Sequence, residues 1–425
     1  MRILLPIIVV SMFLSCSTEP PKEDGRVTLK LYHWMERDRK LWEEEIITPF
    51  EQAHPTIRVV LETSPYSLFV SKSLTSMASG LRVADLMFAE DWFGQELIHR
   101  KYGRNLMPYV ARDFDTATFY HDAFREWQGT AQRDDELFGF PVAIGLTVLF
   151  YNKDLFDAAS VSYPDTAWTY ADLLKAGKQL TVDKDRDGNP EQWGLQFDIH
   201  YTGLETVVYS LGGRTLNEQG NRAVMTEPAT QEAFRFVRDI FRTDRIASNV
   251  TTFINPWEPF VSRRAAMNLI GSHGSFNLEG TGIRWDLAVP PKGPGGKRLS
   301  RRYSMAFLIP HNSPHPDEAW ELLKWIITKS PVQTIDRQYL GLMPVYRPHA
   351  ESSEWLDSEP RYNRRALVEL AQSQSFPLFS PGWQEWRDNN LTPELQLMIQ
   401  GKKTVEQFTK DAERRINNVL EWAYR

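Results

Sequence analysis

Strand-like and helix-like segments alternate near the start of the chain, and this alternation constrains the fold more than any other feature of the sequence. Residues 27–32 (VTLKLY) and 57–61 (IRVVL) have the pattern of β-strands, and residues 84–88 (ADLMF) form a third strand-length segment. Between them, residues 39–53 and 68–79 have the apolar spacing of amphipathic helices. This strand, helix, strand, helix, strand order predicts an α/β domain with a parallel sheet.

Aromatic and acidic side chains follow two of these predicted strands. Trp34 comes just after the first strand, and Asp91 and Trp92 come just after the third. Ligands of open parallel sheets bind beyond the carboxyl ends of the strands. We therefore expect these three residues to lie close to a binding site.

A long β-rich run occupies residues 137–150 and exceeds the length of a typical strand. A chain that leaves one domain and enters the next through an extended segment would have this pattern. Further helices are predicted at residues 231–241, 317–328 and 405–424. The chain is thus long enough, and varied enough, for two domains of ordinary size.

The composition is that of a soluble globular protein, with 42% hydrophobic and 24% charged residues. The net charge of −6 argues against a nucleic-acid partner, because phosphate binding needs concentrated Lys and Arg. Short basic clusters at residues 297–302 and 361–365 are expected to be solvated surface. The 14 tryptophans are mostly expected in the core, but their number also favours a carbohydrate ligand, because indole faces stack on sugar rings.

The single cysteine, Cys16, lies in a segment typical of export. It follows a basic start, an apolar run over residues 3–14 and the small residue Ser15. The run is shorter than a membrane-spanning helix. The segment resembles a bacterial lipoprotein signal, which implies cleavage before Cys16 and diacylation of its thiol; in an ordinary signal peptide the cysteine would be incidental. Residues 1–15 are then a signal peptide and residues 16–26 a flexible tether.

Several motifs occur in the order found in one known family. The chain resembles the bacterial extracellular solute-binding proteins of ABC importers, in the carbohydrate group that includes maltose-binding protein. The motifs are GFP at 139–141, FYNKDLF at 150–156, WTYADL at 168–173, RAAMNLIG at 264–271, PPKGPGG at 290–296, AFLIP at 306–310 and AWELL at 319–323.

The resemblance implies a two-lobed, periplasmic-binding-protein-like α/β fold of type II. Each lobe would be a mainly parallel sheet flanked by helices, and strands near residues 143–148 and 301–304 would cross between the lobes as a hinge. The first lobe would comprise residues 27–144 and 305–346. The second would comprise residues 145–304 and 347–425. Closure of the lobes around a ligand would be the signal that a transporter recognises.

The resemblance also places candidate ligand-binding residues one at a time. Asp91 stands where the family has a carboxylate that accepts sugar hydroxyls, and Tyr201 with Thr202 stands at a position that carries a stacking Tyr. The family often has Trp where this chain has His273, and Gly145 replaces the hinge carboxylate of maltose binders. The full candidate set is Trp34, Asp91, Trp92, Tyr201, Thr202, His273 and Trp383. A structural role is the alternative for each of these residues.

The implied function is capture of a sugar or oligosaccharide and its delivery to ABC transporter permease subunits. The protein would be an extracytoplasmic monomer, anchored by lipid on the periplasmic side or at the cell surface, with no catalytic residues, cofactor or nucleic-acid partner. The alternatives are a binding protein for a non-sugar solute and a surface lipoprotein of the same fold that serves as a sensor partner or adhesin.

One acidic motif stands apart from these residues. Asp183, Asp185 and Asp187, followed by Gly188, match the first half of a calcium-binding EF-hand loop. The twelfth position of that loop is Gly194 and not the bidentate Glu. A polar surface turn is therefore the expected structure, with calcium as the alternative.

Overall fold

The computed structural model describes residues 25–34, 39–129, 133–197, 199, 202–248, 257–331, 341–373, 375–376 and 380–424. The predicted signal peptide, residues 16–24 of the predicted tether, including Cys16, and Tyr201 lie outside the described residues. No helix in the described part of the chain is both long and apolar enough to cross a membrane.

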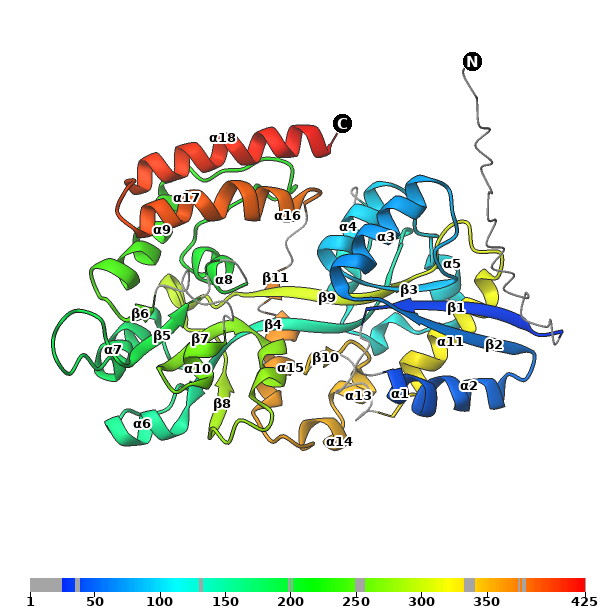
Figure 1. The fold of residues 1–425 in the computed structure, drawn as a ribbon, viewed down its shortest axis with the longest axis horizontal. Helices are drawn as coiled ribbons and strands as arrows, with labels where there is room; N and C mark the ends of the chain where they lie inside the picture. Colours follow the sequence, from blue (N-terminus) through cyan, green and yellow to red (C-terminus); the bar gives the residue numbers. More distant parts are fainter. Residues whose placement is uncertain are drawn as a thin grey trace, which may run out of the picture.

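The predicted parallel strands at the start of the chain are present. Strand β1 (Val27–His33) pairs in parallel with β2 (Ile57–Thr63) and with β3 (Leu86–Glu90). Helices α3 (Tyr66–Ala78) and α4 (Asp91–His99) cover one face of this sheet, and α2 (Thr48–Ala53) lies on the other (Figure 1). Because the strands run parallel, the residues that follow β1 and β3 lie at the same edge.

The helix predicted over residues 39–53 is present but contains a wider turn. It consists of α1 (Arg39–Trp42), a π-helical segment η2 (Glu43–Ile47) and α2. Trp42, Ile46 and Phe50 are buried, as the apolar spacing predicts. The wide turn ends two residues before Pro49, which has no backbone N–H to donate to the preceding turn.

Two long antiparallel strands join the halves of the molecule. The long β-rich run forms a single strand, β4 (Phe140–Asn152), and its partner is β9 (Ser300–Leu308). Gly145 pairs with Tyr303 near the end of this ladder. The sheet order is β2-β1-β3-β9-β4-β7-β5-β6, so β4 and β9 lie at its centre. Figure 1 shows both strands running from one half into the other.

The other half repeats the same architecture. Strand β5 (Trp193–Phe197) pairs in parallel with β6 (Ala247–Ser248) and β7 (Ala265–Gly271), and β8 (Trp285–Ala288) pairs with β4. Its long helices are α7 (Tyr170–Leu180), α8 (Thr202–Ser210), α9 (Pro228–Arg242), α17 (Thr392–Ile399) and α18 (Val405–Ala423). Helices α7 and α18 begin with capping boxes at Thr169 and Thr404.

Shorter elements connect these layers. They are α5 (Met107–Asp113), η3 (Thr116–Thr118), η4 (His121–Glu126), α6 (Lys153–Ala159), α10 (Glu258–Val261), η6 (Ser272–Leu278), η7 (Pro294–Gly296), β10 (Met343–Pro344), α13 (Arg347–Ala350), α14 (Ser353–Leu356), β11 (Ser375–Phe376), α16 (Trp383–Glu385) and the π-helical η8 (Trp386–Leu391). Two longer helices, α11 (Pro316–Lys329) and α15 (Arg364–Ser373), complete the set.

The apolar interior divides into two clusters. One surrounds β1, β2 and β3 and includes Trp42, Phe88 and Phe307. The other surrounds β5 and β7 and includes Phe197 and Phe408. The first cluster also includes Phe150, Phe260 and Ile270, so it continues along the crossing strands into the second half.

The expectation that the basic clusters are solvated surface is wrong for four arginines. Arg298, Arg301, Arg302 and Arg364 are buried, with 5%, 2%, 2% and 1% of their area exposed. Buried guanidinium groups need carboxylate or carbonyl partners, and these four have them. Two of these arginines lie on β9, between the halves.

Candidate functional site

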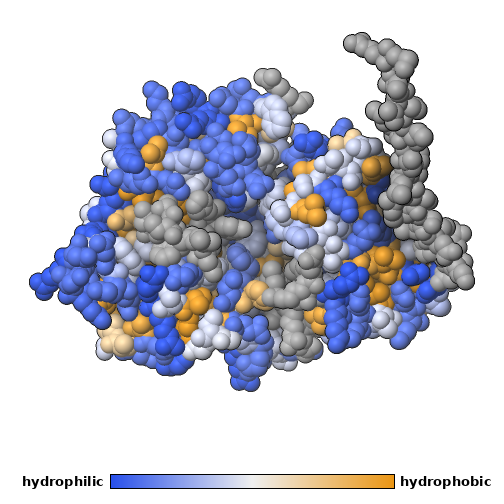
Figure 2. All heavy atoms as spheres, in the orientation of Figure 1, coloured by the Kyte–Doolittle hydropathy of each residue, from blue (hydrophilic) through white to orange (hydrophobic). Residues whose placement is uncertain are grey.

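A cavity of about 850 Å³ lies between the two halves, on the side of α3 and α4. One wall comes from α3 and α4, and the other comes from α16, η8 and α18. Figure 2 shows the surface notched between the halves, at the upper edge of the view. The lining residues are Val70, Leu74, Trp92, Glu96, Gly382, Trp383, Gln384, Glu385, Asp388, Asn389, Asn390, Arg415, Asn418, Val419 and Trp422.

Trp383 is held in a fixed orientation on the second wall. The preceding Gly382 has φ +67, a conformation that favours glycine and turns the chain into α16. The Arg387 guanidinium lies 3.8 Å from the centre of the Trp383 ring, as in a cation–π contact. Arg387 does not line the cavity, whereas Trp383 does. The indole therefore presents its remaining surface to the cavity.

The π-helical segment η8 supplies amide groups beside this indole. Asp388, Asn389 and Asn390 lie within η8 and line the cavity. Asn389 Nδ2 donates to Glu385 Oε2 at 2.7 Å, and Asn390 Nδ2 donates to the Glu385 carbonyl at 3.2 Å. Each amide thus keeps its oxygen as an acceptor and one N–H as a donor. Wide helical turns of this kind are frequent at functional sites.

Trp92 forms the aromatic part of the first wall. Its indole Nε1 donates to Glu90 Oε2 at 2.9 Å, and the Tyr66 hydroxyl donates to the same oxygen at 2.9 Å. Burial raises the pKa of Glu90, while these two hydrogen bonds act to lower it. Trp34 packs edge-on against Tyr66 with ring centroids 5.4 Å apart. The structure thus brings Trp34 and Trp92 to one aromatic cluster, with Trp92 at the cavity.

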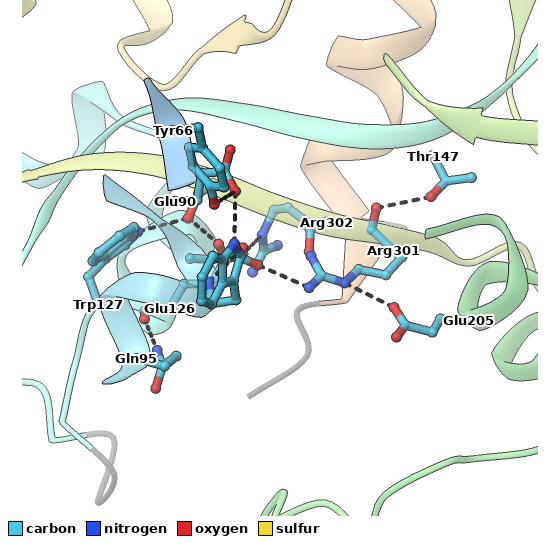
Figure 3. A network of polar contacts seen from close by, with 12 residues as sticks. Tyr66, Glu90, Gln95, Glu126, Trp127, Thr147, Glu205, Arg301 and Arg302 are labelled. Atoms are coloured by element: carbon cyan, nitrogen blue, oxygen red, sulfur yellow. Dashed lines mark hydrogen bonds and ion pairs between the residues drawn. The ribbon is translucent and has the colours of Figure 1, made fainter. Parts of the chain in front are cut away.

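Asp91 takes part in a buried ionic network that joins the halves. Arg301 Nη2 donates to Asp91 Oδ2 at 3.0 Å, and Arg301 Nε donates to Glu205 Oε2 at 3.2 Å. Asp91 begins α4 in one half, and Glu205 lies on α8 in the other. Figure 3 shows Arg301 directed toward Glu205, with Arg302 beside it on β9. The centre of the Trp383 ring lies 6.0 Å from the Arg301 guanidinium, so this network borders the cavity.

Burial and charge act against each other in this network. Burial raises the pKa of Glu205, and Arg301 and Arg387 act to lower it. Burial acts to lower the pKa of Arg301, but Asp91 and Glu205 outweigh it and raise the pKa above the usual value. Arg301 therefore stays charged. A charged guanidinium is needed here because two buried carboxylates depend on it for their ion pairs.

Arg302 forms a second ionic group on the same strand. Its Nε donates to Glu126 Oε1 at 2.6 Å, and the Ser304 hydroxyl donates to the other Glu126 oxygen. Trp127 Nε1 in turn donates to Ser304 Oγ at 2.8 Å. Burial raises the pKa of Glu126, and Arg302 opposes the rise. Arg301 and Arg302 thus tie β9 to the elements that carry their carboxylate partners, which are α4, α8 and η4.

His273 lies at the crossing strands and does not line the cavity. Its Nδ1 is 2.6 Å from the Tyr303 hydroxyl, and burial lowers its pKa to about 4. Tyr303 packs over Gly145, where a Cβ atom would come within 1.9 Å of the Tyr303 ring. Gly145 thus accommodates the Tyr303 ring between the crossing strands. Thr202 begins α8 and is buried, also away from the cavity lining.

The structure therefore brings together part of the predicted set. Trp92 and Trp383 line one cavity, Asp91 and Trp34 lie beside it, and Thr202 and His273 lie apart from its lining. Sequence reasoning missed Glu205, Arg301, Asn389, Asn390 and Trp422. The sequence signal that could have found Trp422 is an indole on a largely polar helix. In the structure Trp422 is 67% exposed.

The acidic motif forms a compact turn at the surface. Oxygen atoms of Asp183, Asp185 and Asp187 lie within 4.8 Å of one another. The backbone N–H groups of Asp187 and Gly188 donate to Asp185 and Asp183. These hydrogen bonds are those of a polar turn, as the sequence predicts by default.

The fold and the cavity between its halves define a two-lobed binding protein. Residues 35–332 match the model of the bacterial extracellular solute-binding protein family, and the chain belongs to that family. A putative binding protein of Brucella abortus is 23% identical over 386 residues, 89% of each chain. An arabinooligosaccharide-binding protein of Halalkalibacterium halodurans is 25% identical over 207 residues, 48% of this chain and 44% of the relative.

Solved structures share the fold. An ABC substrate-binding protein from Listeria monocytogenes, in complex with cycloalternan, has a TM-score of 0.78 at 20% identity, over 93% of this chain and 99% of its own. The sugar-binding protein MalE from Xanthomonas citri has a TM-score of 0.76 at 18% identity, over 93% and 98%. The predicted two-lobed α/β fold is confirmed. The family and these structures are binding proteins and not enzymes.

Proposed function

We propose that this protein captures a sugar or oligosaccharide between its lobes and delivers it to an ABC importer. The observation that carries the proposal is the cavity of about 850 Å³ with Trp92 on one wall and Trp383 on the other. A ligand held between the two indoles touches both halves. Its binding then favours the arrangement in which the halves are close, by the difference in its affinity for the open and closed states.

The lining chemistry supports a carbohydrate ligand. Sugars present apolar C–H faces and a rim of hydroxyl groups, and the cavity offers indoles beside amides and carboxylates. Asn389, Asn390 and Glu385 can bind neighbouring hydroxyls through donors and acceptors of fixed position. Among similar proteins, one was solved with cycloalternan and another is named for arabinooligosaccharide binding.

The candidate residues take definite roles in this proposal. Trp383 and Trp92 stack on sugar rings, and Trp34 supports the first wall through Tyr66. Asp91, already paired with Arg301, has remaining acceptor capacity for a hydroxyl. Thr202 and His273 lie apart from the cavity lining, and Tyr201 lies outside the described residues, so these three stay ligand-binding candidates on the sequence alone. The two moving lobes are proposed to be residues 27–144 with 305–346 and residues 145–304 with 347–425.

Calorimetry against a panel of mono- and oligosaccharides tests the proposal. The Trp383→Ala variant should bind the identified sugar about fivefold to tenfold more weakly, because it loses one stacked ring. Trp168→Ala is the matched control, since Trp168 packs against Phe156 and does not line the cavity. Binding of a peptide or polyamine with no response to any glycan would reject the sugar ligand, and equal affinity in both variants would reject the site.

The lipid anchor at Cys16 is a separate part of the proposal and needs its own test. Wild type expressed in a bacterial host should incorporate a labelled fatty acid and partition into detergent, whereas Cys16→Ala should do neither. Incorporation of equal label into the variant would contradict lipidation at this residue. Delivery is tested by uptake of the identified sugar with and without the protein, in cells that carry the permease subunits.

A further inference from the structure

A second cavity, of about 370 Å³, lies between the halves and shares no lining residue with the first. One wall comes from η4, and the other comes from the end of α8 and the loop after it. Strands β9 and β11 contribute the floor between these walls. The lining residues are Asp122, Arg125, Tyr209, Arg214, Leu216, Asn217, Glu218, Gly220, Lys297, Leu299, Arg302, Ser375 and Phe376.

Cationic side chains outnumber acidic ones around this cavity. Arg125, Arg214, Lys297 and Arg302 line it, against two carboxylates. Arg302 is fully engaged with Glu126 and with neighbouring oxygens. Lys297 is exposed and forms no ion pair with any residue that the structure describes. With Arg302 balanced by Glu126, and Arg125 and Arg214 each facing one carboxylate, Lys297 is the positive charge that the lining leaves unbalanced.

The two remaining cations are held only loosely. Arg125 Nε lies 3.7 Å from Asp122 Oδ1, with 60% and 49% of the side chains exposed. Arg214 Nη2 lies 3.7 Å from Glu218 Oε1, with 46% and 76% exposed. Exposed pairs of this length contribute little stability. Both guanidinium groups can therefore turn toward a ligand at small cost, and guanidinium forks match the geometry of phosphate and carboxylate oxygens.

An aromatic surface lies beside these charges. The rings of Tyr209 and Phe376 stack with centroids 4.3 Å apart and an angle of 4° between planes. Leu216 and Leu299 add apolar area. Tyr209 belongs to α8, and Phe376 belongs to β11. The cavity thus combines an apolar wall with an oxyanion-binding rim, the usual composition of a small-molecule site.

We propose that this cavity is a second binding site, for a small organic anion that bears a phosphate or several carboxylates. Arg214 and Lys297 bind the oxyanion from one half, and Arg125 binds it from the other. Because its cations come from both halves, a bound anion stabilises their present separation. The proposal rests on this cavity alone and is independent of the ligand bound between Trp92 and Trp383.

Titration of the full chain with sodium phosphate and, separately, trisodium citrate tests the site. Sodium chloride at matched ionic strength controls for screening. We expect a saturable rise in melting temperature with at least one anion and none with chloride. The anion that binds more tightly distinguishes a phosphate-bearing from a carboxylate-bearing ligand.

Substitutions at exposed residues separate the site from general charge effects. Lys297→Gln combined with Arg214→Gln should weaken the apparent affinity about tenfold or more, because two charged hydrogen-bond donors are lost. Lys410→Gln is the matched control, since Lys410 is exposed on α18 and lines neither cavity. No saturable shift with either anion, or an undiminished shift in the double variant, would overturn the proposal.

Discussion

Replacement of Arg301 by Met is expected to lower the free energy of unfolding by about 3–5 kcal/mol at pH 7, the usual cost of removing one partner from a buried ion pair. The burial of all three groups sets this magnitude. The side chains of Arg301, Asp91 and Glu205 are 3%, 9% and 5% exposed, so water cannot replace the lost guanidinium. Met keeps the apolar stem of the side chain and removes the guanidinium, so the stability change reports the lost charge and hydrogen-bond donors together with the space they filled.

The loss should depend on pH in a defined direction. Burial already raises the pKa of Glu205 in the folded protein, and Arg301 is the first group that opposes the rise. Without Arg301 the pKa rises further above the value in the unfolded chain. The folded state then binds a proton more readily than the unfolded state, so stability falls as pH increases through that window. Part of the lost stability should therefore return between pH 7 and about pH 5.

Urea unfolding followed by circular dichroism at both pH values measures these quantities. The triple variant Arg301→Met, Asp91→Asn, Glu205→Gln should be more stable than Arg301→Met alone, because no buried charge is left unpaired. Arg361→Met is the control, because Arg361 and its partner Glu359 are 78% and 76% exposed. Its free energy of unfolding is expected to change by no more than about 0.5 kcal/mol. A loss below about 1 kcal/mol for Arg301→Met, or an equal loss at both pH values, would refute the reasoning.

Three further predictions follow from single contacts. Gly145→Ala should lower the free energy of unfolding by about 1–3 kcal/mol, because the new methyl group overlaps the Tyr303 ring. In urea unfolding of the double variant, Tyr303→Ala should remove most of the cost that Gly145→Ala adds. Thr404→Ala should lower the free energy of unfolding by about 1 kcal/mol, because the capping box of α18 is lost. The slope of this free energy against urea concentration should stay unchanged. Burial lowers the pKa of His33 to about 3, so the unfolded state alone binds a proton as pH falls below about 6.5, and stability drops. His33→Phe should flatten this drop in melting temperature between pH 7 and pH 4; an unchanged slope would contradict the assignment.

Local pattern predicted the first strands, the long crossing strand and several of the longer helices. The alternation in residues 27–32 and 57–61 gave strands that the structure extends by one or two residues, as β1 and β2. The long run around residues 137–150 became β4, whose length follows from its passage between the halves. The wide turn at residues 43–47 could not be predicted, because it preserves the apolar face of the helix and changes only the backbone hydrogen bonds.

The binding site was predicted less completely than the fold. Trp92 was predicted because it follows the third strand, and Trp383 was predicted from the family resemblance. Both line the cavity between the halves. The partners of Asp91 could not be predicted, since Arg301 and Glu205 are distant in sequence and only the crossing of β9 brings them together. The basic pair on β9 was misinterpreted as solvated surface for the same reason: a sequence shows the charge of a side chain but not the carboxylates that bury it.

The position of these charges links the crossing strand β9 to the cavity. Arg301 lies on a strand that crosses between the halves, contacts a carboxylate from each, and has its guanidinium 6.0 Å from the ring of Trp383. A movement of one half relative to the other must change at least one of these contacts, because α4 and α8 carry the two carboxylates. Under the proposed function, a ligand stacked on Trp383 would lie close to the one guanidinium that contacts a carboxylate from each half.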